Sequence, residues 1–227
     1  MSALRVPLLV LQAVCIQLAC SPPRPSPSKG RYHVEEMFLL RIAPAIFRIQ
    51  QIFTWMCTAF ELLCYIETIR PLPAVLSNIC PSTSTSIRLT TPFVVGVLAV
   101  ILATVIRRDC YNALGPLFTF DLTIHPQHRL VTERCYSYVR HPAYAGSLLL
   151  IWGLSLSHLT KGSWITECGP LHTGLSRYSC AIIWSTWALS VCVSRAKAED
   201  QKMKEMFRDE WEAYTVAVPY WFFPCLL

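Results

Sequence analysis

The stretch LVTERCYSYVRHPAYAG, residues 130–146, organises this chain of 227 residues together with a second stretch, residues 195–224. The first stretch places tyrosines, an arginine and a histidine directly before an apolar run. The second stretch begins where the next apolar run ends. Polar segments that flank two consecutive membrane-length runs return to the same side of a bilayer. The two stretches are therefore predicted to meet at one membrane face.

Composition indicates a membrane protein and not a soluble domain. Hydrophobic residues make up 53% of the chain and charged residues 15%, and the mean hydropathy is +0.40. A helix needs roughly 17–25 apolar residues to cross a bilayer. Five stretches have or come close to this length, and they predict an all-α, polytopic integral membrane bundle of about five helices. They are residues 4–20, 42–66, 92–107, 143–160 and 178–194.

Individual residues inside these spans predict how the helices start and pack. Glu61 lies at membrane depth, where a carboxylate is costly unless it faces other helices, so we expect it to hydrogen bond between helices. Pro92 stands where proline is favoured, at the start of a helix. Gly146 and Gly153 are small enough for a neighbouring helix to approach closely.

Basic residues between the spans predict the orientation. If the five spans alternate, one side of the membrane carries Arg5, Arg70, Arg88, Lys161 and Arg177. The other side carries thirteen basic residues, namely Arg24, Lys29, Arg31, Arg107, Arg108, Arg129, Arg134, Arg140, Arg195, Lys197, Lys202, Lys204 and Arg208. The positive-inside bias makes this second side cytosolic, so both polar stretches face the cytosol. Because the charges are dispersed between apolar runs, the net charge of +6 does not indicate a nucleic-acid-binding module.

The cysteines predict neither a disulfide framework nor a metal site. Their number, eleven, is odd, and no CxxC pair is present. Several lie inside apolar runs, namely Cys15, Cys57, Cys64, Cys180 and Cys192. We therefore expect them to act as small hydrophobic residues that either face lipid or pack within the protein.

The N-terminal region is open to two interpretations. Residues 1–20 contain one early arginine and a fourteen-residue apolar core, which suits either a first span or a cleaved signal peptide. The Pro/Ser-rich linker SPPRPSPSK, residues 21–29, is predicted to be extended and to end this first span. We expect two regions, residues 1–108 with the N-terminal helices and linker, and residues 109–227 with the chemistry.

The second region is predicted to hold a cap, a helical hairpin and an amphipathic helix. Residues 109–140 are too long for an idle loop, and residues 118–124 have strand-like or extended composition. The last two spans form the hairpin. After Arg195, apolar residues recur at three and four residues, which predicts an amphipathic helix against the membrane or the cap. These residues are Met203, Met206, Phe207, Trp211 and Tyr214.

Two groups of polar residues indicate chemistry. Tyr136, His141 and Tyr144 place three hydrogen-bonding rings at the entrance of a span, which suits a purine nucleoside, with His141 as a neutral donor or acceptor. Arg195 and Glu199 lie four residues apart. The guanidinium of Arg195 can bind the anionic head of a substrate, and the carboxylate of Glu199 can bind the ribose hydroxyls or the amino group of a cofactor. The alternative is a plain surface ion pair worth about 0.2–0.5 kcal/mol. No GxGxxG fingerprint is present, which argues against a Rossmann-type enzyme.

Residues 140–146, RHPAYAG, resemble the RHPxYxG motif of the isoprenylcysteine carboxyl methyltransferases, and residues 130–136 resemble the LVTxGxY lead-in of that family. The resemblance covers about half the chain. It continues to the C-terminus through Arg195, Glu199, Asp200, Met203, Phe207, Tyr214, Val218, Pro219 and Pro224. Three positions depart from the family pattern, because Arg134 and Arg208 stand in place of glycine and Asp200 in place of glutamate.

The resemblance implies a cytosolic pocket for S-adenosylmethionine. The matching cofactor positions are Thr123, His128, Arg129, Leu130, Val131, Tyr136, His141, Pro142, Ala143, Tyr144 and Glu199. Arg195 falls where the family has the arginine that contacts the substrate, so it is the expected catalytic and substrate-binding residue. No metal is implied.

The implied activity is methyl esterification of the C-terminal prenylcysteine of CaaX-processed proteins in the endoplasmic reticulum membrane. Two alternatives stay open at this point. Membrane phospholipid N-methyltransferases have similar RHPxYxG and EE signatures, and a non-catalytic membrane scaffold of the same fold is the other possibility. Arg195 favours the first activity, because a guanidinium suits a carboxylate and is awkward beside a lipid ammonium group.

Overall fold

The computed structural model describes residues 3–21, 42–70, 80, 87–120, 122–124 and 128–226. Helical elements are α1 (Arg5–Cys20), α3 (Ala43–Ile69), α5 (Thr91–Leu114), η2 (Gly115–Leu117), η3 (Arg134–Ser137), α6 (Pro142–His158), α7 (Trp164–Glu167), α8 (Gly174–Phe207) and α9 (Asp209–Ala217). None of the described residues forms a β-strand, so the all-α prediction is confirmed for them. Apart from Ser21, the predicted Pro/Ser-rich linker lies outside these residues, as do Arg24, Lys29 and Arg31.

Each of the five predicted spans is helical. The first four correspond to α1, α3, α5 and α6, and the fifth is part of α8. By length and composition, one helix of the described part, the stretch Ala45–Ile69, is long and apolar enough to cross a membrane, with a mean hydropathy of 1.3. Crossing by the other helices stays a prediction.

The C-terminal region differs from the prediction in where its helices divide. Helix α8 continues without a break past Arg195 to Phe207, and α9 follows after Arg208. The predicted amphipathic helix is therefore partly the last turns of α8 and partly α9. Phe118 has an extended backbone, and residues 118–120 and 122–124 form no strand, apart from an isolated β-bridge at Thr123.

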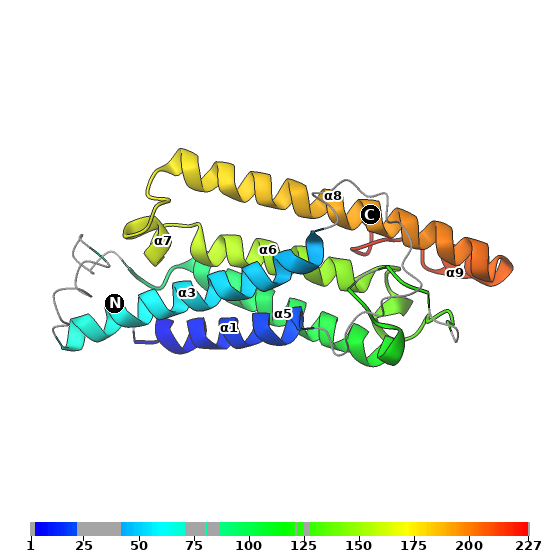
Figure 1. The fold of residues 1–227 in the computed structure, drawn as a ribbon, viewed down its shortest axis with the longest axis horizontal. Coiled ribbons are helices and arrows are strands. Elements are labelled where there is room, and N and C mark those ends of the chain that lie inside the picture. The colour runs from blue at the N-terminus through cyan, green and yellow to red at the C-terminus, as the bar shows by residue number, and fades with distance from the viewer. Residues whose placement is uncertain are drawn as a thin grey trace.

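The long helices α1, α3, α5, α6 and α8 run along one axis of an elongated bundle (Figure 1). Consecutive long helices run in opposite directions, as predicted for alternating spans. One end of the bundle holds the start of α1, the end of α3, and α7. The opposite end holds the segments between α5 and α6, and α9.

Small residues allow α5 and α6 to pack closely. A Cβ atom on Gly153 would lie 2.8 Å from the carbonyl oxygen of Gly96, and one on Gly146 would lie 2.7 Å from Cγ of Arg107. Real Cβ atoms do not approach other atoms this closely. The close approach predicted at Gly146 and Gly153 is therefore confirmed. Pro92 lies in the first turn of α5, as expected.

A buried ion pair joins three helices at the α7 end. Nε of Arg5 donates to Oε2 of Glu61 at 2.6 Å, and Nη2 donates to Oε1 at 3.0 Å. The backbone N–H of Trp164 donates to the same Oε1 at 3.0 Å. Arg5 and Glu61 are fully buried. The prediction that Glu61 hydrogen bonds between helices is confirmed, since its partners come from α1 and α7.

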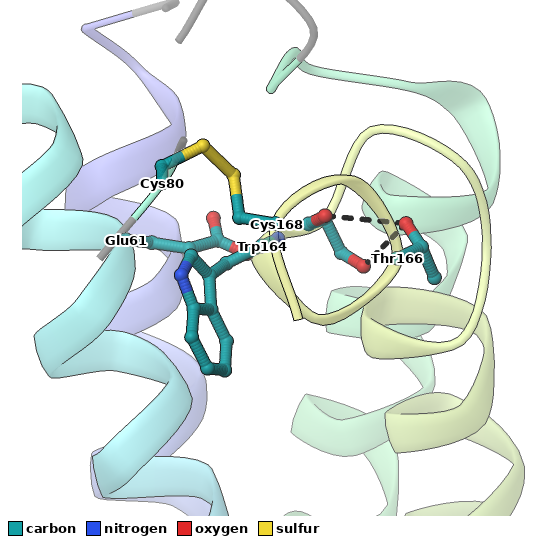
Figure 2. Close-up of a disulfide and its surroundings, with 6 residues drawn as sticks. Glu61, Cys80, Trp164, Thr166 and Cys168 are labelled. Carbon is teal, nitrogen blue, oxygen red and sulfur yellow. Dashed lines mark hydrogen bonds between the residues drawn. A yellow bond between two sulfur atoms is a disulfide. The ribbon is translucent and has the colours of Figure 1, made fainter. Parts of the chain in front are cut away.

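A disulfide joins Cys80 to Cys168 at the same end, so the prediction of a chain without disulfides is wrong here. Figure 2 shows the cross-link beside Glu61 and Trp164. The partners are 88 residues apart, and local cysteine spacing carries no signal for a pair that only the fold brings together. Both cysteines belong to loops predicted to share one membrane side. The free cysteines Cys15, Cys20, Cys57, Cys64, Cys110 and Cys192 are buried, which agrees with a packing role, whereas Cys180 is exposed and does not pack.

Candidate functional site

A cavity of about 200 Å³ lies at the end of the bundle opposite α7. Its wall is formed by side chains from α3, α5, α6, α8 and α9 and from the segment between α5 and α6. Of the residues predicted to contact cofactor or substrate, those on this wall are Thr123, His128, Arg129, Leu130, Val131, Tyr136, His141, Ala143, Tyr144, Arg195 and Glu199. Pro142 is buried at the start of α6 and does not line the cavity. The fold therefore gathers two polar stretches that are distant in sequence.

The RHP segment is held by the C-terminal segment of the chain. The backbone N–H of Arg140 donates to the carbonyl oxygen of Tyr220, and that of His141 donates to Trp221, both at 2.9 Å. Pro142 then begins α6, where its missing N–H has no cost because the first helical N–H groups lack intrahelical partners. Together these contacts fix His141 directly before the helix.

His141 lies between two carboxylates of α8. Its Nε2 is 2.6 Å from Oδ1 of Asp200, and its Nδ1 is 3.2 Å from Oε2 of Glu199. Burial by itself lowers the pKa of His141, but the hydrogen bonds to Asp200 and Glu199 and their charges outweigh burial and raise the pKa to about 9. At neutral pH the ring is therefore an imidazolium that donates from both nitrogens. The prediction of a neutral ring is wrong, because it did not place two carboxylates around His141.

The predicted rings surround the same cavity. The hydroxyl of Tyr144 donates to Oε1 of Glu199, and the ring centroids of His141 and Tyr144 are 5.7 Å apart. Tyr136 reaches the cavity from η3, and its carbonyl oxygen accepts a hydrogen bond from the hydroxyl of Tyr214 at 2.7 Å. The cavity wall therefore presents both the hydrogen-bonding groups and the ring faces of these residues.

Arg195 is only 7% exposed, and its Nη1 donates to the carbonyl oxygen of Phe120 at 2.8 Å. Because the guanidinium is buried on the cavity wall, the alternative of a plain surface pair with Glu199 is wrong. A buried cation that faces a cavity is suited to an anionic ligand group.

Asp200 and Arg107 are charged residues of the site that were not predicted as site residues. Asp200 accepts a hydrogen bond from Nε1 of Trp221 at 3.0 Å, in addition to its contact with His141. Arg107 lines the cavity, and its Nη1 donates to Oγ of Ser147 at 2.6 Å. In the sequence, Arg107 follows an apolar run like any residue at headgroup level, so nothing indicates that its side chain points into the bundle.

The cavity wall also has a substantial apolar part. Helix α3 contributes Ile46 and Phe47, and α8 contributes Trp187, Ala188 and Val191. A molecule with a charged head and a hydrocarbon tail matches a wall of this mixed kind.

Part of the chain is similar to known proteins. Residues 94–205 match the model of the isoprenylcysteine carboxyl methyltransferase (ICMT) family. Over these residues, 112 of the 227, the chain is similar to the ICMT family. Two relatives from Oryza sativa, subspecies indica and japonica, both named "Probable protein-S-isoprenylcysteine O-methyltransferase", are 30% identical over 126 residues, which is 55% of this chain and 57% of each relative.

A third relative, from Arabidopsis thaliana, is named "Protein-S-isoprenylcysteine O-methyltransferase B". It is 27% identical over 126 residues, 55% of each chain. The chain thus spans little more than half the length of the curated relatives it matches.

The structure explains two of the departures from the ICMT pattern. Arg134 and Arg208, which stand where the family pattern has glycine, have positive φ angles of 61° and 40°. Glycine adopts positive φ without steric cost, whereas arginine does not. Arg134 forms an ion pair with Asp109, its Nε donating to Oδ1 at 2.8 Å. The backbone course that glycine favours is therefore kept in this chain with arginine in both positions.

Proposed function

We propose that the chain catalyses S-adenosylmethionine-dependent methyl esterification of the C-terminal prenylcysteine carboxylate of CaaX-processed proteins. The match to the ICMT family model and the names of the relatives support this reaction class. The observation that carries the proposal for this chain is the buried guanidinium of Arg195 on the wall of a cavity that also contains His141, Tyr144 and Glu199.

The reaction needs no general base. A C-terminal carboxyl group has a reference pKa of about 3.3–3.7, so it is ionised at neutral pH. Catalysis then consists of aligning the carboxylate with the methyl group and excluding water from the pocket. The site fits this requirement, since its ionisable groups are engaged in fixed contacts with one another and are not paired as a nucleophile and base.

The side chains divide into two roles in this proposal. Glu199 and the rings of Tyr136, His141 and Tyr144 would hold S-adenosylmethionine, which supplies the methyl group when bound. The donor set fits, because a carboxylate accepts from hydroxyl or amino groups and flat rings stack on a purine. Arg195 would bind the substrate carboxylate through two parallel N–H donors and thereby fix the oxygen that attacks.

The apolar part of the wall supports a lipid-modified substrate. A prenyl chain is soluble in the bilayer, and apolar side chains from α3 and α8 give it a surface to contact. We place the protein in the endoplasmic reticulum membrane with several spans and with the cavity facing the cytosol. The distribution of basic residues supports this orientation.

A phospholipid N-methyltransferase is the nearest alternative activity, and Arg195 argues against it. A second buried cation on the wall, Arg107, adds to this argument, because two guanidinium groups repel a lipid ammonium. A non-catalytic scaffold is the other alternative. The preserved backbone course at Arg134 and Arg208 argues against the loss of the site in this chain.

The experiment measures transfer of labelled methyl from S-adenosylmethionine to N-acetyl farnesylcysteine, with phosphatidylethanolamine as the competing acceptor. We expect transfer to the prenylcysteine. Arg195→Lys keeps the charge but loses the planar fork, so kcat should fall about ten- to a hundredfold, the equivalent of a charged hydrogen bond of about 1.5–3 kcal/mol. Arg195→Ala should be worse, while cofactor affinity stays near that of the unmodified chain.

Arg177→Lys is the matched control, because Arg177 is also a buried arginine of α8 but lies at the opposite end of that helix. It should leave kcat unchanged. Full activity of Arg195→Ala would remove the carboxylate-binding role, and methyl transfer only to phosphatidylethanolamine would replace the proposed activity with the phospholipid one. If the chain does not bind S-adenosylmethionine, the non-catalytic scaffold would be the remaining alternative.

A further inference from the structure

The adjacent acids Glu199 and Asp200 of α8 have different surroundings. The Glu199 side chain is 29% exposed and lines the cavity, and its Oε2 lies 3.2 Å from Nδ1 of His141. The Asp200 side chain is 17% exposed, does not line the cavity, and lies 2.6 Å from Nε2 of His141. One carboxylate therefore faces the space for a ligand, and the other faces protein.

Asp200 connects three segments of the chain. Besides His141, it contacts Nη1 of Arg140 at 3.2 Å and accepts from Nε1 of Trp221 at 3.0 Å. Trp221 belongs to the C-terminal segment whose backbone carbonyls accept from Arg140 and His141. The neighbouring Phe222 is buried in a cluster with residues of α6 and α8. Asp200 thus has His141 at Oδ1 and both Arg140 and Trp221 at Oδ2, and these contacts restrict its orientation.

We propose that Asp200 is a positioning residue, which fixes His141 and the C-terminal segment so that Glu199 is left to exchange its contact with His141 for a contact with the cofactor. This inference rests on the proposed function. It assigns different roles to two acids that the sequence presents as a single acidic pair.

The charge of His141 makes this division of roles measurable. A neutral imidazole has one ring N–H and can donate to only one of the two carboxylates, whereas an imidazolium donates to both. Asp200 and Glu199 of α8 and Tyr144 of α6 lie beside the ring, while Arg140 contacts Asp200 and the charge of Arg195 acts on Tyr144. The C-terminal segment contacts the ring through uncharged Phe222.

The direction of the pH effect follows from the raised pKa of His141. In the folded chain the pKa is about 9, above the ordinary value of 6.5. The stabilising contribution of the imidazolium is fully present below pH 6.5 and is lost as the pH rises through about 9. Above that pH the neutral ring keeps one N–H, for which Asp200 and Glu199 compete, so His141 and the C-terminal segment are no longer held in one arrangement. Affinity for S-adenosylmethionine is therefore expected to fall.

The test compares S-adenosylmethionine affinity by calorimetry from pH 6 to pH 10 for the full chain and three variants. In Asp200→Asn the fall in affinity should move to lower pH by about one to two units, because a hydrogen bond between charged groups is lost. Affinity at pH 6 should stay within a few-fold. Asp200→Glu, which carries the residue of the family pattern, should restore the original profile.

Glu199→Gln should behave differently, with affinity reduced about tenfold or more at every pH. The amino group of S-adenosylmethionine also titrates in this range, near the ordinary value of about 7.7–8.0, so only differences between variants are used. If Asp200→Asn does not fold, His141→Gln provides the comparison, because it removes the titrating ring and should leave only the titration of the ligand.

Each of three outcomes would overturn the inference. In the first, the affinity of Asp200→Asn varies with pH as that of the unmodified chain does. In the second, Asp200→Asn loses affinity equally at all pH values, as Glu199→Gln does, and in the third, His141→Gln retains the fall in affinity near pH 9. Failure of the proposed function is a separate result, since the unmodified chain would then neither bind S-adenosylmethionine nor transfer its methyl group.

Discussion

Replacing Arg208 with glycine should stabilise the protein. Arg208 lies between α8 and α9, is exposed, and has φ 40° and ψ −108°. This conformation is outside the regions that residues with a Cβ favour. The backbone there is fixed by the two helices, because the N–H of Arg208 donates to the carbonyl of Lys204 and its own carbonyl accepts from Glu212.

The magnitude follows from two opposing terms. A residue held in a sparsely populated conformation costs about 1–3 kcal/mol, whereas glycine loses more freedom on folding, at a cost of about 0.5–1 kcal/mol. Arg208→Gly should therefore gain about 1 kcal/mol, which corresponds to a Tm increase of about 2–4 °C for a chain of this size.

Two other glycine variants provide comparisons. Arg134→Gly relieves a positive φ of 61° but also loses the contact with Asp109, so its Tm should change little. Lys197→Gly lies inside α8 at an exposed position and should lose about 1 kcal/mol.

The assay is thermal unfolding of detergent-solubilised protein. Unfolding is monitored by a fluorogenic thiol reagent, which reacts with the buried free cysteines as they become exposed. Expected Tm values decrease in the order Arg208→Gly, unmodified chain, Lys197→Gly. A Tm for Arg208→Gly as low as that of Lys197→Gly would refute the reasoning, because it would show that the backbone between α8 and α9 imposes no strain on arginine.

The remaining predictions concern the α7 end of the bundle. Arg5→Met and Glu61→Leu should each lose about 3–5 kcal/mol, because each leaves a buried charge without its partner, while the double variant should lose much less than the sum. Cys80→Ser and Cys168→Ser should each lose up to about 4–5 kcal/mol, the chain-entropy value for a cross-link between residues 88 apart. Thermal unfolding checks both, and added reductant should lower the Tm of the unmodified chain but not of the serine variants.

Helices and the approximate site could be predicted from the sequence for physical reasons. Membrane-length apolar runs leave the backbone little choice other than helix, and the alternation of spans places residues 130–146 and 195–224 at the same end. The interhelical role of Glu61 followed in the same way, from the cost of a carboxylate at membrane depth.

Features that depend on two distant groups could not be predicted. The charge of His141 requires both Asp200 and Glu199 on either side of the ring, and the sequence shows only that these acids lie somewhere on the next helix. The direction of the Arg107 side chain depends on the rotation of α5 within the bundle. The unbroken course of α8 past Arg195 was also hidden, because the change from apolar to polar composition there looks like a helix end.

The disulfide described above has a practical consequence for following the protein in cells. Disulfides persist in oxidising compartments, whereas the cytosol keeps thiols reduced. In the proposed orientation, Cys80 and Cys168 lie on the lumenal side and the cavity on the cytosolic side. A molecule inserted this way acquires the cross-link, and an inverted molecule exposes the same thiols to cytosolic reductants. Gel mobility without reductant, compared before and after thiol reduction, would then report the orientation of each newly made molecule without an added tag.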